Sequence, residues 1–141
     1  MSGVASGAVF LDDAPMLSTV LEYYKNGRGN GRLTNEIIND AGQNQESGRD
    51  QGHAQDGLEY TETALTLHHA LGNTEVFTMD NHRLRAGLEY TAKFNLGEDV
   101  PFTPNCGAYP KSGWGCKALS KSSGISPMWE VAGGLYDQTA P

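Results

Sequence analysis

The sequence predicts an all-α fold built from helical hairpins. Apolar side chains recur at spacings of three and four residues in several stretches of the chain, which is the periodicity of a helix with one buried face. No stretch of the 141 residues alternates convincingly between apolar and polar side chains, as a half-buried strand would. Segments rich in glycine and proline separate the periodic stretches, and such segments end helices and form turns.

The first predicted helix covers residues 14–25. Its apolar side chains share one stripe, made of Met16, Leu17, Val20, Leu21 and Tyr24. Asp13 precedes this stretch as a suitable N-cap, and Gly27 follows its end. Residues 26–32 (NGRGNGR) cannot continue a helix, so we expect a turn or loop there.

Two longer helices are expected next. One covers residues 53–71 and stops at Gly72-Asn73, and its apolar face consists of Leu58, Ala64, Leu65, Leu67 and Leu71. The other covers residues 75–95 and is closed by Gly97, and its stripe consists of Phe77, Leu84, Leu88 and Ala92. Glu89 and Lys93 are four residues apart on that helix and are expected to pair.

A long loop and a last helix complete the predicted organisation. Residues 97–125 contain three prolines and five glycines, and loops of that length are usually functional or poorly ordered. Ser126-Pro127 then opens a helix, whose apolar side chains are Met128, Val131, Ala132 and Leu135. The chain therefore reads as a single domain of about four helices.

Charge narrows the possible partners. Ten basic and 17 acidic residues give a net charge of −7, which argues against nucleic acid as a partner because nucleic-acid binding needs a basic face. An acidic chain can still bind an anionic sugar through a local cationic cleft. No apolar run is long enough to span a membrane. The N-terminal stretch lacks basic residues and reaches Asp12 and Asp13 early, so it is a poor signal peptide.

The two cysteines, Cys106 and Cys116, lie in one glycine-rich stretch. A disulfide that closes this short loop and a pair of free thiols are both compatible with the sequence. Two cysteines without further cysteines or a clustered histidine make a poor zinc site. We therefore expect neither a metal nor another cofactor.

Residues 42–55 (GQNQESGRDQGHAQ) form the most informative segment. It crowds together Gln43, Asn44, Gln45, Glu46, Arg49, Asp50, Gln51, His53 and Gln55. In a core helix each of these groups would need a buried partner, and a solvated surface turn is the plain alternative to a functional site. If residues 46–53 are helical, four of the side chains share one face at spacings of three, four and seven: Glu46, Arg49, Asp50 and His53.

Two chemistries compete for that face. A metal site would use Glu46, Asp50 and His53, because carboxylate and imidazole ligands suit several divalent ions. Arg49 disfavours a cation there and favours an anionic substrate. In acid–base chemistry on a carboxylated sugar, Arg49 and the amides would hold the anion while His53 moves a proton. The second chemistry uses more of the residues present.

Two stretches of the chain carry a family resemblance. NQESGRDQGHAQDGLEY (residues 44–60) and DNHRLRAGLEYTAKFNLGEDVPF (residues 80–102) resemble the alginate-lyase superfamily, especially its glucuronan- and alginate-degrading members. FLDDAPMLSTVLEYYKNGRGNG (residues 10–31) and PMWEVAGGLY near the C-terminus are similar to the same group. The resemblance covers most of the chain. It implies an α/α toroid and β-elimination on an anionic uronate polysaccharide outside the cytoplasm, in the periplasm or the extracellular space.

The resemblance also implies residue roles. His53 is the expected base or the partner of the neutralising groups, and Glu46 is expected to support it. Asn44, Gln45 and Arg49 are expected to bind the uronate carboxylate, and Gln43 belongs to the same set. Tyr90 and Tyr136 are candidates for the proton donor that such sites take from tyrosine, and packing in the core is the alternative for Tyr90. Arg83 or Arg85 could line the cleft, and Trp114 could stack on a sugar ring or merely cap its loop.

The chain also departs from the family pattern. Ser126 stands where an arginine is expected, and Gly133-Gly134-Leu135 replaces an aromatic–Asn–His stretch. The family's toroid needs more hairpins than 141 residues supply, so we expect residues 1–141 to be one partial domain, the C-terminal portion of such an enzyme. A non-catalytic carbohydrate-binding remnant and, less favoured, a metal-dependent hydrolase are the alternatives.

Overall fold

The computed structural model describes residues 1–56, 58, 60–105 and 128–139. These residues form seven helices: α1 (Ser2–Phe10), α2 (Ala14–Asn26), α3 (Leu33–Glu36), α4 (Gln51–Asp56), α5 (Tyr60–Leu71), α6 (Glu75–Leu96) and α7 (Met128–Thr139). One isolated bridge, between Ile37 and Asn44, is the extent of β pairing within the described residues. The prediction of an all-α fold is confirmed for this part of the chain.

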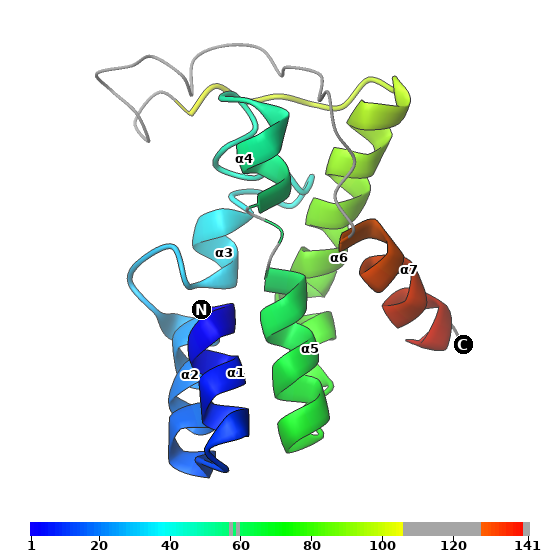
Figure 1. Ribbon diagram of the computed structural model, residues 1–141. Coiled ribbons are helices and arrows are strands. Elements are labelled where there is room, and N and C mark those ends of the chain that lie inside the picture. The colour runs from blue at the N-terminus through cyan, green and yellow to red at the C-terminus, as the bar shows by residue number, and fades with distance from the viewer. Residues whose placement is uncertain (57, 59, 106–127, 140–141) are drawn as a thin grey trace.

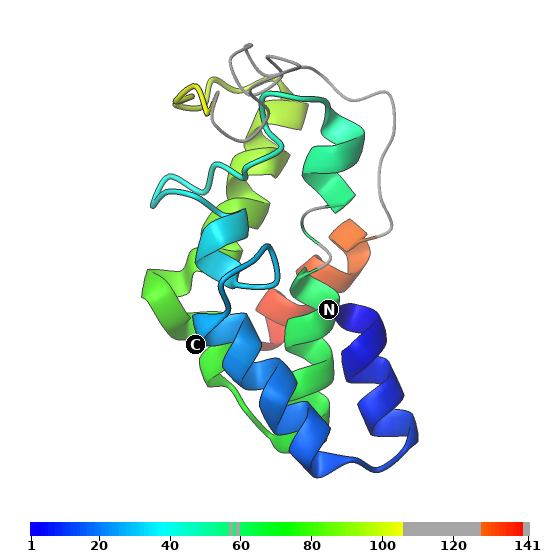
Figure 2. The ribbon, with the colours of Figure 1, turned by 90° about the vertical axis from the view of Figure 1, so that its left-hand side faces the viewer.

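The helices form a bundle with a polar segment at one end. α1 packs against α2 and α5, and α5 packs against α6 and α7. Figures 1 and 2 show α1, α2 and α5 side by side, while α3 and α4 lie along α6 toward its C-terminal end. The Asn95 amide of α6 donates a 2.8 Å hydrogen bond to Gln51 of α4. The residues between α2 and α5 are thereby held against the C-terminal half of α6.

The core lies where these helices meet. Its larger members are Tyr24, Leu33, Ile37, Leu58, Leu67, Val76, Phe77, Leu84 and Leu88. Trp129 and Tyr136 of α7 pack against this cluster while remaining partly exposed. No helix among the described residues is long and apolar enough to cross a membrane.

The prediction for α2 is confirmed with its caps. The Asp13 carboxylate accepts a 2.9 Å hydrogen bond from the backbone N–H of Met16, and Gly27 follows the last residue of the helix. Residues 27–32 contain no helix, and three glycines of this turn surround one tyrosine. A β-carbon added at Gly27, Gly29 or Gly31 would come within 2.8 Å of the Tyr23 side chain. The NGRGNGR spacing is therefore explained by the close passage of the backbone around that ring.

The single helix expected over residues 53–71 is wrong. The structure has α4 ending at Asp56 and α5 beginning at Tyr60. In one straight helix, Tyr60 would lie six residues or roughly 240° around the axis from Ala54, yet both side chains are buried. Two separate helices allow both faces to reach the core.

α6 matches its prediction at the ends and departs from it near the start. Gly97 closes the helix with a left-handed φ of 94°, and Phe77, Leu84 and Leu88 are buried as expected. The helical geometry is interrupted over residues 79–82, however, where Asp80, Asn81 and His82 adopt φ values of 49°, 57° and 58°. Left-handed residues with side chains cost roughly 1–2 kcal/mol each, and periodicity gave no sign of this kink.

The remaining predictions concern the two ends of the chain. Helix α1 was not predicted. Residues 98–105 contain no helix, as expected for the loop over residues 97–125, and α7 follows with Ala132 buried. The rest of that loop, with Cys106, Trp114 and Cys116, lies outside the described residues.

Candidate functional site

His53 and Asp50 form the best-defined polar pair of the predicted segment. The Asp50 carboxylate accepts the backbone N–H of His53 at 2.9 Å, and His53 Nδ1 lies 2.8 and 2.7 Å from its two oxygens. The backbone hydrogen bond first, and then the side-chain hydrogen bond, lower the pKa of Asp50 below its usual value. An ionised Asp50 keeps the histidine proton on Nδ1 and leaves Nε2 as the acceptor.

Arg49 links this pair to Glu46. Its guanidinium Nη1 lies 3.5 Å from Glu46 Oε2, and its Nε lies 3.8 Å from Asp50 Oδ2. The four residues predicted to cluster are therefore joined in one chain of contacts. The expected cause was wrong, because residues 46–49 form a turn and the helix begins at Gln51. Asp50, which caps α4, is the carboxylate that bonds His53 Nδ1, and the expected support of His53 by Glu46 stays a prediction.

Asn44 and Gln43 turn inward instead of toward a ligand. Asn44 is fully buried, its amide donates to the carbonyl of Ala54 at 2.7 Å, and its Oδ1 accepts the N–H of Glu46 at 2.8 Å. The Gln43 amide exchanges two hydrogen bonds with the backbone of Thr103, at 2.7 and 2.8 Å. These bonds give both amides structural partners, and substrate binding by Asn44 and Gln43 stays a prediction.

Gln45 lies at the boundary between the buried and open parts of the segment. Its side-chain amide donates to the carboxylate of Glu36, and its backbone N–H donates to the Glu36 carbonyl at 2.8 Å. Glu36 is 3% exposed. Gln45 also lines a pocket, so it keeps a position from which it can contact a ligand.

Tyr90 is committed to the fold. Its hydroxyl donates a 2.8 Å hydrogen bond to the carbonyl of Pro101, and burial raises its pKa to about 12. This arrangement matches the packing alternative rather than the predicted proton donor. Burial likewise raises the pKa of Tyr136 to about 12. The guanidinium carbon of Arg85 lies over the Tyr136 ring, 5.8 Å from its centroid.

Arg83 pairs with Asp40 across the turn before the polar segment. Its side chain is mostly buried, and it does not line the pocket that contains His53. The predicted cleft role of Arg83 therefore has no geometric support in the described part of the chain. The predicted stacking residue Trp114 lies outside the described residues.

A pocket of about 220 Å³ gathers the open side chains of the site. It is lined by Asn30, Glu36, Gln45, Glu46, His53, Asp56 and Tyr60. Three of the predicted site residues therefore share one cavity wall: Gln45, Glu46 and His53. Tyr60, at the start of α5, is the tyrosine that lines this pocket, and sequence reasoning missed it although it ends the stretch that carries the family resemblance.

The lining of this pocket is acidic. Glu36, Glu46 and Asp56 contribute carboxylates, and Arg49 contacts this lining through its pairing with Glu46. Like charges oppose the entry of an anionic sugar, and one arginine offsets only part of the charge of three carboxylates.

The metal hypothesis gains no geometric support. Across the described residues, no group of three or more histidine, cysteine, aspartate or glutamate side chains is arranged to hold a metal ion. Both carboxylate oxygens of Asp50 lie within hydrogen-bond distance of His53 Nδ1.

Comparison with protein-family models, curated proteins and solved structures gives no match for this chain.

Proposed function

We propose that this chain carries part of the active site of a polysaccharide lyase that cleaves a uronic-acid polymer, alginate or glucuronan, by β-elimination. The observation that carries the proposal is the Asp50–His53 pair at a pocket wall, with His53 Nδ1 held by the carboxylate. Such a pair presents Nε2 as a base. The resemblance of residues 44–60 to the alginate-lyase superfamily supplies the substrate class.

The proposed reaction moves one proton from carbon to oxygen. His53 Nε2 removes the proton from the ring carbon beside the carboxylate, and that electron pair forms the new C=C bond. The bond from the next ring carbon to the glycosidic oxygen breaks, and the Tyr60 hydroxyl protonates the departing oxygen. Arg49 stabilises the charge that develops on the carboxylate, and preorganised donors of this kind usually contribute the largest single effect.

The proposed fold is a segment of an α/α toroid. Short connections of three residues join α1 to α2 and α5 to α6, as in successive helical hairpins. Side chains of α1 and of the turn after it remain open to solvent, including Val9, Phe10 and Leu11, and Phe10 is 88% exposed. Neighbouring hairpins of a complete toroid would cover such side chains.

Ultraviolet absorbance of the purified chain with alginate, and separately with glucuronan, tests the proposal. Absorbance is expected to rise as the conjugated double bond forms, and His53→Ala is expected to lower the rate about 10²–10⁴-fold. His69→Ala, at an exposed histidine of α5, is the matched control and is expected to retain the wild-type rate. Activity that survives a strong chelator would exclude the metal-dependent hydrolase.

A flat absorbance trace from a folded, monodisperse sample would contradict independent catalysis. The second candidate function, binding of a saccharide without cleavage, would then stand. The acidic lining of the pocket favours this candidate, since carboxylates and amides are good hydrogen-bond partners for sugar hydroxyls. Retained saccharide binding together with loss of turnover in His53→Ala would instead support the enzyme.

A further inference from the structure

The turn after α2 contains two Asn-Gly-Arg triplets, at residues 26–28 and 30–32. Asparagine is a thermally labile residue. When glycine follows it, the backbone nitrogen of the glycine can attack the side-chain amide carbon, because glycine has no β-carbon to hinder the approach. The two triplets offer the same chemistry within seven residues of sequence, and the structure places them in different surroundings.

Asn26 is held against this reaction. It is the last residue of α2, and its side-chain amide donates a 3.0 Å hydrogen bond to the Glu22 carboxylate. The attacking nitrogen would be that of Gly27, whose N–H donates to the Tyr23 carbonyl at 2.8 Å. Cyclisation at Asn26 would therefore break two hydrogen bonds and open the end of a helix.

Asn30 is open to the same reaction. Asn30 and Gly31 are the two central residues of a turn, which the Arg32 N–H closes by donating to the Gly29 carbonyl at 3.1 Å. The closing bond of such a turn uses the N–H of its fourth residue and leaves that of the third free. Within the described part of the chain, neither the Gly31 N–H nor the exposed Asn30 side chain is held by a hydrogen bond.

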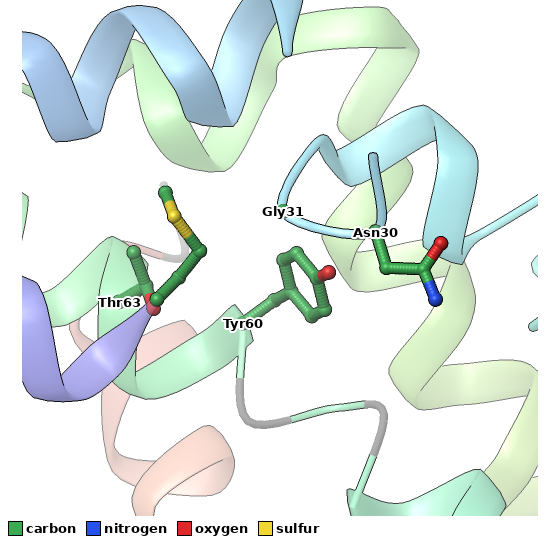
Figure 3. Close-up of a pocket in the computed structure, with 5 residues that line it drawn as sticks. Asn30, Gly31, Tyr60 and Thr63 are labelled. Carbon is green, nitrogen blue, oxygen red and sulfur yellow. The ribbon is translucent and has the colours of Figure 1, made fainter. Parts of the chain in front are cut away.

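Packing requires the glycine that makes Asn30 labile. A β-carbon added at Gly31 would lie 2.3 Å from the Tyr23 ring, so a larger residue at position 31 would displace the turn. Asn30 itself lines the pocket that contains His53. Figure 3 shows Asn30 and Gly31 on the same side of the Tyr60 ring. A chemical change at Asn30 therefore changes the wall of the candidate site.

We propose that Asn30 is a site of spontaneous deamidation. The Gly31 nitrogen bonds to Cγ of Asn30, and the side-chain nitrogen leaves as ammonia together with the Gly31 N–H proton. Water then adds to either carbonyl of the resulting succinimide and opens the ring, which gives aspartate or isoaspartate at position 30. An uncharged amide thereby becomes a carboxylate in a pocket whose lining already contains Glu36, Glu46 and Asp56.

Peptide mapping of the full chain after incubation at mildly alkaline pH tests the proposal. Trypsin cleavage after Arg28 places Asn26 and Asn30 on separate peptides, and replacement of the amide by a carboxylate changes the mass of the modified peptide. In the native chain, Asn30 is expected to react about tenfold faster than Asn26. That ratio corresponds to about 1.4 kcal/mol of activation free energy, the size of one or two hydrogen bonds.

The same chain in concentrated urea is the control. Unfolding removes the hydrogen bonds that protect Asn26, so the two asparagines are expected to react at similar rates there. In native buffer, Asn30→Gln is expected to leave its peptide unmodified, because the longer side chain closes its ring far more slowly. Equal rates at both asparagines in the native chain would overturn the proposal. A native Asn30 that stays intact while the unfolded chain reacts would overturn it too.

The effect of the new charge on ligand binding rests on the proposed function and is measured separately. Asn30→Asp carries the charge of the product, and Asn26→Asp adds the same charge at a residue that does not line the pocket. Titration calorimetry with glucuronate is expected to show about fivefold weaker binding for Asn30→Asp and the native affinity for Asn26→Asp.

The outcomes separate the two proposals. Equal affinities of the native chain and the Asn30→Asp chain would overturn the effect on binding. Absence of glucuronate binding by the native chain would count against the proposed function and remove that effect with it. The peptide map decides the modification at Asn30 in either case.

Discussion

Two pairs of polar residues in segment 42–55, Gln43 with Asn44 and Asp50 with His53, have opposite surroundings. Gln43 and Asn44, in the first half, are 1% and 0% exposed and bond backbone groups of distant residues. Asp50 and His53, in the second half, keep 48% and 43% of their side chains exposed and bond each other. Gln43 and Asn44 organise the fold, and Asp50 and His53 present polar groups at the surface.

The difference teaches how a polar composition should be interpreted. Amide side chains offer a donor and an acceptor together, so they can replace a peptide group and satisfy buried backbone. Gln43 does this for both the N–H and the carbonyl of Thr103. A carboxylate–imidazole pair has no such backbone counterpart, and its members remain where solvent or a ligand can reach them.

The largest expected contrast between the halves comes from their glycines. Gly42 has φ of 92°, and an added β-carbon would lie 2.0 Å from the Ala86 carbonyl oxygen. Gly42→Ala is therefore expected to lower the free energy of unfolding by about 3 kcal/mol or more, from left-handed strain and overlap with α6. Urea unfolding followed by circular dichroism measures this change.

Gly52→Ala is the control in the other half. Gly52 lies in α4, and its added β-carbon would meet the Asp50 carboxylate at 3.2 Å as its nearest contact. Helix propensity favours alanine and this close contact opposes it, so the free energy of unfolding is expected to change by less than about 1 kcal/mol. Equal effects of the two substitutions would contradict the division of the segment into an inward and an outward half.

A smaller contrast is expected between Asn44→Ala and Arg49→Ala. Removing the Asn44 amide leaves the Ala54 carbonyl and the Glu46 N–H without their partner, so the free energy of unfolding is expected to fall by about 3 kcal/mol or somewhat less. Removing the Arg49 side chain breaks partly exposed ion pairs, and the free energy of unfolding is expected to fall by at most about 1 kcal/mol. Chemical denaturation of the two variants side by side decides the comparison, and a larger loss in Arg49→Ala would reverse the assignment of roles.

The smallest effect concerns the pH dependence that Asp50 contributes. Its pKa is lower in the folded chain than the ordinary value of about 3.9. The stability that Asp50 contributes is therefore complete above that ordinary value and is lost as the pH falls through the folded-state pKa. The difference in stability between the native chain and Asp50→Asn is expected to be constant at neutral pH and to shrink on acidification below about pH 4.

Unfolding curves between pH 3 and pH 7 measure this dependence. Asp99→Asn, at an exposed position after α6, serves as the control and is expected to change stability little at any of these pH values. A stability difference for Asp50→Asn that stays constant from pH 4 to pH 3 would contradict this dependence on the Asp50 carboxylate.

Sequence periodicity predicted the longer helices that bury several large side chains, and it missed α1 and the short α3. α2 and the C-terminal part of α6 bury leucine, valine or aromatic side chains at helical spacing, so their faces stand out. α1 buries only Ala5 and Ala8, while Val4, Val9 and Phe10 remain exposed. Alanine at the contact allows close packing on α2 and α5 but leaves no apolar stripe in the sequence.

The sequence predicted which residues of the candidate site lie together, but it did not predict which of them bond to each other. The cluster of Glu46, Arg49, Asp50 and His53 follows from their proximity in the chain. Which carboxylate holds His53 depends on where α4 begins, and a shift of a few residues moves that role from Glu46 to Asp50. The position of Tyr60 depends on the break between α4 and α5, which the apolar pattern concealed.

The kink at residues 79–82 divides α6 into two parts, residues 75–78 and residues 83–96. Residues 75–78 contact α2 and α5. Glu75 forms an ion pair with Lys25 of α2, and the Phe77 ring centroid lies 5.3 Å from that of His68 of α5. Residues 83–96 instead carry the contacts to Gly42, Gln51 and Pro101. Three consecutive left-handed residues between them interrupt the axial hydrogen-bond ladder. The two parts of α6 are therefore positioned by different contacts, and the polar segment is held by the second part.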